Sequence, residues 1–170
     1  MEIRTALPAD TLAIADIHVA GWQSAYRGLV PDDHLDRLSV SKRREQWVKA
    51  VECGRPKILV AEIDDAVVGW IPFDQCRDAD KPSGTGEIWA IYVAPDRLGQ
   101  GVGRELWLRA LAGLRHHGFL HVTLWVLSLN HRACGFYAKA GFRPELESAK
   151  TVDIGGAQLQ ELRYSRGIAA

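Results

Sequence analysis

The sequence has few cysteines, no excess of charge of one sign and no long hydrophobic run. Its three cysteines among 170 residues, Cys53, Cys76 and Cys134, lie far apart, with neither a CxxC pair nor a zinc-ligand spacing. Lys plus Arg and Asp plus Glu number 21 each, so the formal net charge is zero. This balance argues against a general nucleic-acid-binding protein, a class that usually carries a strong basic excess.

No apolar segment approaches the ~20 residues that a membrane-spanning helix needs. The N-terminal stretch MEIRTALPADTLAIADIHVAGW shows no basic-then-apolar signal pattern. Together with the scattered cysteines, these absences predict a soluble cytoplasmic protein with reduced thiols and no membrane partner. His116, His117 and His121 straddle a predicted helix end and the next strand, so we expect no metal there.

The sequence does have the length and the apolar residues for one packed domain. Domains commonly run to ~100–150 residues, and a chain of this size buries roughly 70% of its unfolded surface. Hydrophobic residues make up 47% and charged residues 25%, both ordinary for a globular protein. We therefore predict a single domain over residues 1–170.

Hydrophobic periodicity and turn residues predict an alternation of strands and helices. Strands are predicted over 2–7, 57–64, 66–73, 86–94, 121–128, 142–147 and 157–165, and helices over 10–26, 31–49, 101–118 and 130–141. The strands 86–94 and 121–128 are apolar on both faces, which indicates central positions. The helix between them implies a parallel pair with a right-handed crossover. The predicted fold is therefore α/β (α+β): a mixed sheet of about seven strands with helices on its faces.

The stretch PDRLGQGVGREL, residues 95–106, joins a predicted strand to a predicted helix and contains Gly99, Gly101 and Gly103. Glycines allow positive φ and close backbone approach, and the first N–H groups of a helix form an anion site. A Walker A loop would need a Lys–Ser/Thr pair, but Arg104 and Glu105 follow the glycines. A dinucleotide-binding loop would need glycine where Arg104 stands. The alternative without a ligand is a tight turn between strand and helix.

The spacing and context of this loop resemble the GNAT superfamily of acyl-CoA-dependent N-acyltransferases. The family's loop typically reads Gln or Arg, two residues, Gly, one residue, then Gly or Ala. Leu98 departs from the usual Gln or Arg, and Arg97 stands one residue earlier. The departure removes one side-chain contact but leaves the backbone donors. The resemblance implies that the loop binds the pyrophosphate of acyl-CoA, most plausibly acetyl-CoA.

A second segment, NHRACGFYAKAGF at 130–142, resembles the family's N-x-x-A-x-x-F-Y-x-x-x-G-F motif. Asn130 and Tyr137 are two helical turns apart and share a face, with Asn130 a candidate N-cap and Gly141 a candidate C-terminal cap. The alternative is an ordinary amphipathic helix that packs Phe136 and Tyr137 into the core. The clear resemblance covers residues 84–143. It implies a GNAT-like, mostly antiparallel twisted sheet with a central parallel pair and about four flanking helices.

The resemblance assigns roles to individual residues. It implies contacts to acyl-CoA from Ile91, Tyr92, Val93, Leu98, Gly99, Gln100, Gly101, Val102, Gly103, Arg104, Asn130, Ala133 and Phe136. The family's two central strands splay apart, and the backbone N–H near Val93 is then the candidate donor to the thioester carbonyl. Tyr137 is the candidate general acid for the thiolate, since a phenol stays protonated at neutral pH. Glu87 is the candidate general base, directly or through water.

Each of these roles has a structural alternative. Tyr137 is otherwise a core tyrosine or a contact to pantetheine, and Glu87 is otherwise a solvated acid at a strand end. In the family the first two helices wall the acceptor site, which makes Trp22 and Tyr26 candidate acceptor-binding residues. They are four residues apart and share a helix face, so the alternative for them is core packing.

The resemblance predicts transfer of an acetyl group from acetyl-CoA to a primary amine, most plausibly that of a small molecule. A protein N-terminus or a lysine is the alternative acceptor. A catalytically silent acyl-CoA-binding or regulatory module is the alternative outside enzymes, and a nucleotide-binding protein is disfavoured because the P-loop lysine is missing. A homodimer is an expectation taken from the family alone.

Overall fold

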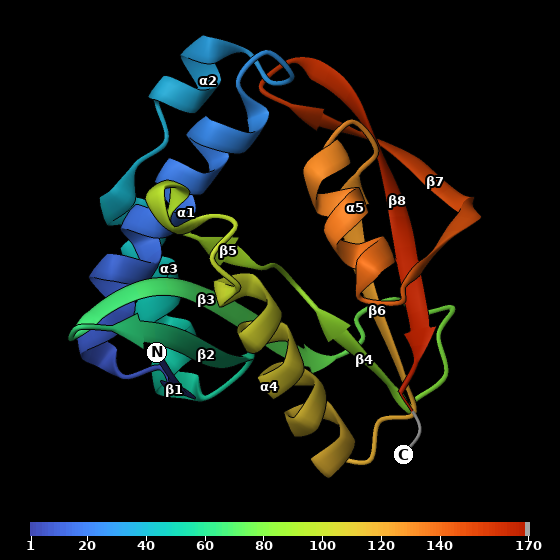
Figure 1. The fold of residues 1–170 in the computed structure, drawn as a ribbon. Helices are drawn as coiled ribbons and strands as arrows, with labels where there is room; N and C mark the ends of the chain where they lie inside the picture. Colours follow the sequence, from blue (N-terminus) through green and yellow to red (C-terminus); the bar gives the residue numbers. More distant parts are fainter. Residues whose placement is uncertain (169–170) are drawn as a thin grey trace.

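A mixed eight-stranded sheet forms the centre of the structure, a computed structural model that describes residues 1–168 (Figure 1). The strands are β1 (Glu2–Thr5), β2 (Lys57–Ile63), β3 (Ala66–Gln75), β4 (Thr85–Ile88), β5 (Tyr92–Val93), β6 (His121–Leu127), β7 (Arg143–Ile154) and β8 (Ala157–Gly167). The helices are α1 (Thr11–Tyr26), α2 (Asp32–Asp36), α3 (Val40–Cys53), α4 (Val102–His116) and α5 (His131–Lys139), with 3-10 turns at Pro8–Asp10 and Pro95–Arg97. The spatial order is β1-β2-β3-β4-β6-β8-β7, and β5 pairs with β3.

The sheet is antiparallel except for its central pair, β4 and β6. This confirms the parallel pair that the strand–helix–strand unit predicts. The helices lie on both faces, with α4 and α5 on the face that Figure 1 presents and α1 and α3 behind the sheet. None of the helices within residues 1–168 combines the length and the apolar character needed to cross a membrane.

Spacing along α4 explains how it covers the sheet. Leu106, Ala110 and Leu114 recur every four residues and are fully buried against Ile88 of β4 and Leu124 of β6. On the other face, the α1 residues Ile14 and Ile17 pack with Val60 and Trp70 of the sheet. Apolar layers thus join α4 to one face of the central strands and α1 to the opposite face of β2 and β3.

The helix predicted over 31–49 is two helices, α2 and α3. Ser39 has an extended backbone and its hydroxyl accepts a hydrogen bond from the Lys42 N–H at 3.3 Å. A serine in this position caps a new helix, because its side chain replaces the missing intrahelical acceptor. The chain therefore turns after α2, whose Leu35 is fully buried.

The strand predicted over 86–94 is also interrupted. Ile88 pairs with Phe73, and Tyr92 pairs with Trp70, so four steps along this chain face three steps along β3. The extra residue is a β-bulge, which bends a strand and increases its twist. Opposite it stands Pro72, whose carbonyl accepts from the Trp89 N–H and which has no N–H of its own to donate.

The two last strands are longer than predicted. β7 runs to Ile154 rather than to residue 147, and its register against β8 shifts between Glu145 and Lys150. A turn at Gly155 and Gly156, both at positive φ, joins the two strands.

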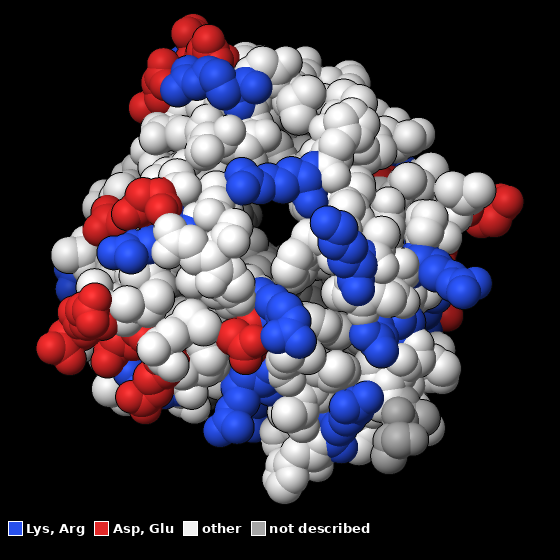
Figure 2. Space-filling view, in the orientation of Figure 1, with Lys and Arg blue, Asp and Glu red and all other residues white. Residues whose placement is uncertain are grey.

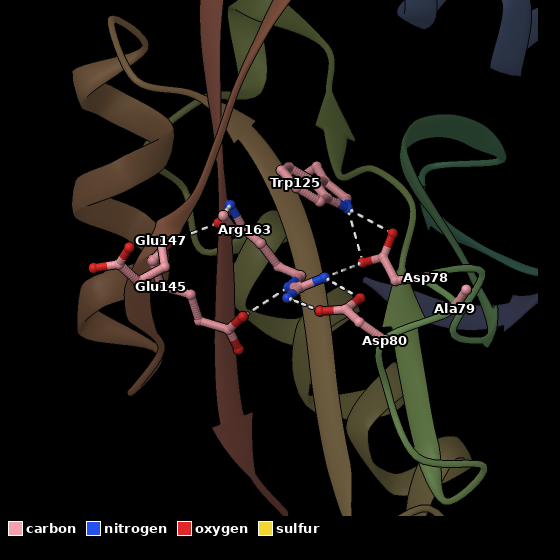
Figure 3. Close-up of a pocket in the computed structure, with 8 residues that line it drawn as sticks. Asp78, Ala79, Asp80, Trp125, Glu145, Glu147 and Arg163 are labelled. Atoms are coloured by element: carbon pink, nitrogen blue, oxygen red, sulfur yellow. Dashed lines mark hydrogen bonds and ion pairs between the residues drawn. The ribbon is translucent and has the colours of Figure 1, made fainter.

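Arg163 of β8 lies at the centre of an ion-pair cluster on the face opposite α5 (Figure 3). Its nearly buried guanidinium donates to Asp78 and Asp80 of the β3–β4 loop and to Glu145 of β7, at 2.6–3.0 Å. Asp78 also accepts from the Trp125 indole N–H at 3.0 Å, and Lys81 donates to Glu145 at 2.7 Å. The cluster ties the β3–β4 loop to the last two strands beside a cavity of about 510 Å³.

These ion pairs predict an acid-dependent loss of stability. Partial burial acts to raise the pKa of Glu145, but hydrogen bonds from Lys81 and Arg163 outweigh it and lower the pKa to about 2. The unfolded chain therefore binds the extra proton first, and the contribution present above about pH 4.5 is lost as the pH falls toward 2. We expect Glu145→Gln to remove about 2 kcal/mol of unfolding free energy at pH 7, allowing for solvent screening of a quarter-exposed carboxylate.

Urea unfolding at several pH values between 7 and 3 measures this effect. Glu147→Gln is the matched control, because Glu147 lines the same cavity and forms no ion pair within residues 1–168. Equal pH slopes for the Glu145→Gln variant and the wild type would contradict the assignment.

Candidate functional site

The central parallel pair opens into a gap after three residues. β4 pairs with β6 only from Thr85 to Glu87, opposite His121 to Thr123. β5 then pairs with β3 alone, while β6 continues to Leu127 with β8 as its only partner in the described part of the chain. The bulge described above causes this separation, because it draws β5 toward β3.

Unpaired backbone groups of β5 face the gap. The Ala94 N–H bonds to the Val68 carbonyl of β3 at 2.8 Å. Because N–H groups alternate in direction along an antiparallel strand, the Val93 N–H points away from β3 toward β6. The splayed strands and a free donor at Val93, both expected from the resemblance, are thus features of this fold.

The glycine loop forms the second wall of the gap. Gly99 and Gly101 have φ of +78° and +86°, a region that favours glycine, and Gly101 precedes the first residue of α4. No backbone N–H from residue 98 to residue 104 donates a hydrogen bond to another group within residues 1–168. Seven consecutive donors at a helix N-terminus are an arrangement that can bind an anion without a lysine.

Packing brings the loop, β5 and α5 together. A Cβ added to Gly103 would lie 3.6 Å from Phe136 of α5 and 3.7 Å from Val93. Leu98, at the position where the family has Gln or Arg, is partly buried and extended, and Arg104 pairs with its neighbour Glu105 at 2.8 Å. Figure 2 shows an opening between the β5 region and α5, with Lys and Arg side chains around it.

α5 presents Asn130 and Tyr137 as predicted. The Asn130 side chain accepts from the Ala133 N–H at 3.1 Å and caps the helix, and Gly141 follows the helix at φ +85°. Tyr137 is buried among Phe136 and Phe142, yet its hydroxyl has no hydrogen-bond partner within residues 1–168. Burial raises the pKa of Tyr137 well above its ordinary value, so the hydroxyl stays protonated.

Glu87 is a buried carboxylate on the opposite face of the sheet, not a solvated acid at a strand end. Its side chain is 2% exposed. Arg77 of the β3–β4 loop donates to Glu87 three times, from Nε and from its backbone N–H at 3.0 Å and from a terminal nitrogen at 2.5 Å. The guanidinium of Arg77 also lies 4.0 Å from the centre of the Trp89 ring. Arg77 was not among the predicted site residues, since nothing in the sequence of this polar loop distinguishes it.

Trp22 and Tyr26 lie at the C-terminal end of α1, beside the gap. Their rings meet edge to face at 4.8 Å. The Trp22 indole N–H donates to the Tyr92 hydroxyl at 2.6 Å, and the Asn130 side chain approaches the Tyr26 hydroxyl at 3.5 Å. Both are half-buried and also pack against a buried cluster that includes Leu35, so core packing, the structural alternative, is at least part of their role.

Comparison with known proteins agrees with this geometry. The Acetyltransferase (GNAT) family is matched over residues 15–142, three quarters of the chain. The chain belongs to the GNAT acetyltransferase family. Its GNAT sheet departs from the predicted outline only in detail, with eight strands in place of about seven and five α-helices in place of about four.

Individual relatives match nearly the whole length of this chain. The uncharacterized N-acetyltransferase YuaI of Bacillus subtilis is 29% identical over 161 residues, 94% of this chain and 89% of its own. The L-amino acid N-acyltransferase MnaT of Escherichia coli is 30% identical over 144 residues, 84% and 79% of the two chains. The solved structure of yncA from Salmonella typhimurium with its cofactor acetyl-CoA shares the fold, with a TM-score of 0.75, 24% identity and coverage of 100% and 95%.

Proposed function

We propose that this chain transfers an acetyl group from acetyl-CoA to the primary amine of a small molecule, with both substrates bound together. The single observation that carries the proposal is the row of unpartnered backbone N–H groups from residue 98 to residue 104 beside a gap in the sheet. A pyrophosphate provides oxygens for such donors, and an extended pantetheine arm fits against the free backbone of β5. Acetyl-CoA in the yncA structure and the amino-acid acceptor in the name of MnaT support this choice.

We assign the acyl-CoA contacts to three segments of the wall. The backbone of residues 98–104 binds the pyrophosphate, and Arg104 adds positive charge where Leu98 offers none. Residues 91–93 bind the pantetheine amides along β5, and the Val93 N–H polarises the thioester carbonyl. Asn130, Ala133 and Phe136 of α5 line the other side.

Tyr137 is the general acid in this proposal. Departure of the CoA thiolate requires a proton, and the buried phenol, which has no hydrogen-bond partner within residues 1–168, provides it. The second proton that the acceptor nitrogen releases as the amide forms then restores the phenol. Its raised pKa keeps the proton in place across the neutral range.

Glu87 is the general base, directly or through a water molecule. An alkyl ammonium has a pKa near 10.4 and no free lone pair at neutral pH, so the acceptor must lose a proton before it attacks. Glu87 lies just before the bulge, on the face opposite α4 and α5. Trp22 and Tyr26 wall the acceptor side of the gap.

Release of free thiol from acetyl-CoA over a panel of amines tests the proposal. We expect release with one or more small primary amines and none without an amine. Release only with peptides would favour the protein acetyltransferase alternative. Binding of acetyl-CoA without any release would favour the silent module, and thermal stabilisation by ATP or NAD in place of acetyl-CoA would favour a nucleotide-binding protein.

The glycine loop yields a second prediction. Ala at residue 101 must adopt a left-handed backbone or move the loop, which costs roughly 1 kcal/mol of stability. We expect Gly101→Ala to weaken acetyl-CoA binding by about fivefold or more in calorimetry, because the donors shift. Gly118→Ala is the control, since Gly118 also has positive φ (+79°) and open space around it but follows the far end of α4. The same affinity in both variants would exclude the loop from binding.

Tyr137→Phe tests the general acid. We expect kcat to fall about 100-fold with acetyl-CoA affinity within about twofold, because only the proton donor is lost. Tyr164→Phe, at another buried tyrosine in the same core, is the matched control. An unchanged kcat in Tyr137→Phe would remove the role.

A further inference from the structure

Within residues 1–168, Arg77 is the one residue that donates hydrogen bonds to the Glu87 carboxylate. Three of the hydrogen bonds that reach this carboxylate come from Arg77: two at Oε2 and one at Oε1. An Arg–carboxylate pair bound at two points fixes orientation as well as charge. The Trp89 ring supports the other side of the guanidinium, so Arg77 is itself held in place.

We propose that Arg77 is a positioning residue for Glu87: it holds this buried carboxylate turned so that Oε1 takes the proton of the acceptor amine. The inference rests on the proposed function. Each carboxylate oxygen offers about two acceptor directions. Among the described residues, Oε2 receives two donors, both from Arg77, whereas Oε1 receives one and has a second acceptor direction without a donor. One proton passes from the ammonium to Oε1 and later leaves to water, so the carboxylate is restored.

The surroundings of Glu87 make this cation necessary. Asp74 stands directly opposite on β3 and so shares its face, and Asp78 and the Cys76 thiol lie on the loop nearby. Across β6 the neighbour is Thr123, which carries no charge. Asp74 is paired with the exposed Arg55 at 3.2 Å. Glu87 is therefore buried beside other acidic groups, and Arg77 is the cation in contact with it.

The position of Arg77 depends in turn on the Arg163 cluster. Asp78, the next residue along the chain, is bound by both Arg163 and Trp125 (Figure 3). Asp80 and Lys81 add bonds from the same loop to β8 and β7. These bonds fix the polar loop against the sheet. They matter for Arg77 because about half of its side chain is exposed. The hydrogen bonds to Arg163 therefore help to hold Arg77 in place, and through Arg77 they help to hold the Glu87 carboxylate.

A double-mutant cycle with Arg77→Gln and Glu87→Gln tests the proposal, using an amine that the panel identifies. In the wild-type background we expect Arg77→Gln to lower kcat about tenfold, with the KM for acetyl-CoA within about twofold. The acid limb of kcat/KM should move to higher pH by about one unit, because a carboxylate that loses its cation takes up a proton more readily. In the Glu87→Gln background the same change should alter kcat by less than about twofold.

Carbon-13 NMR of glutamate-labelled protein gives a readout that needs no turnover. The Glu87 signal is identified by its absence in Glu87→Gln, and its titration midpoint should rise in Arg77→Gln. Arg77→Lys keeps the charge but not the two-point bond, so its Glu87 titration midpoint should lie between those of the wild type and Arg77→Gln. Arg55→Gln is the control, since it removes an exposed arginine from the neighbouring Asp74 and should leave the acid limb in place.

Separate results decide separate questions. An unmoved Glu87 midpoint in Arg77→Gln, or equal kcat losses in both backgrounds, would overturn the positioning role. A wild-type kcat in Glu87→Gln would instead refute Glu87 as the base, and a panel without thiol release would refute the proposed activity; the NMR titration still decides whether Arg77 holds the carboxylate. If Arg77→Gln fails to fold, Arg77→Lys and the double variant, which also removes the buried charge, provide the same comparison.

Discussion

The pairing of β4 with β6 stops after Glu87, and the geometry of the site depends on that limit. The extra residue between Ile88 and Tyr92 draws the chain toward β3, so the two central strands separate at the middle of the sheet. Separation leaves backbone donors of β5 without a strand partner. In a closed sheet these groups would be consumed by the ladder, and there would be no room for a substrate between the strands.

Two helices border the gap because of where their strands end. α4 starts just after β5, so its N-terminus and the loop before it lie beside the gap, while α5 follows β6 on the same face. Gly103 lies close to Val93 and to Phe136, which connects the three segments in one wall. The glycine loop and α5 lie on this face of the sheet, whereas the buried Glu87 carboxylate lies on the opposite face.

The β3–β4 loop beside Glu87 is held by ion pairs more than by apolar packing. The β3–β4 loop is polar, and Arg163 and Lys81 hold it against β7 and β8. Arg77, from the same loop, holds Glu87. Buried ion pairs of this kind are costly to break, because a remaining unpaired charge has lost its water. The stability of the loop and the state of Glu87 are therefore linked through neighbouring residues.

The sequence by itself determined the features that depend on residues close together along the chain. Apolar spacing predicted α4 and the central strands, and Asn130 predicted the start of α5. The closely spaced glycines predicted the loop before α4. The split between α2 and α3 depends on the Ser39 cap. It was not predicted because the helical apolar pattern continues across this residue. Only the tertiary structure decided the bulge at Pro72, because the cause lies on a different strand. Likewise, only the fold places a carboxylate 10 positions away in sequence beside Arg77, and carboxylates 18 or more positions away beside Arg163. Ion pairs between distant segments leave no periodic signal in a chain, since their partners are selected by the packing of the whole sheet.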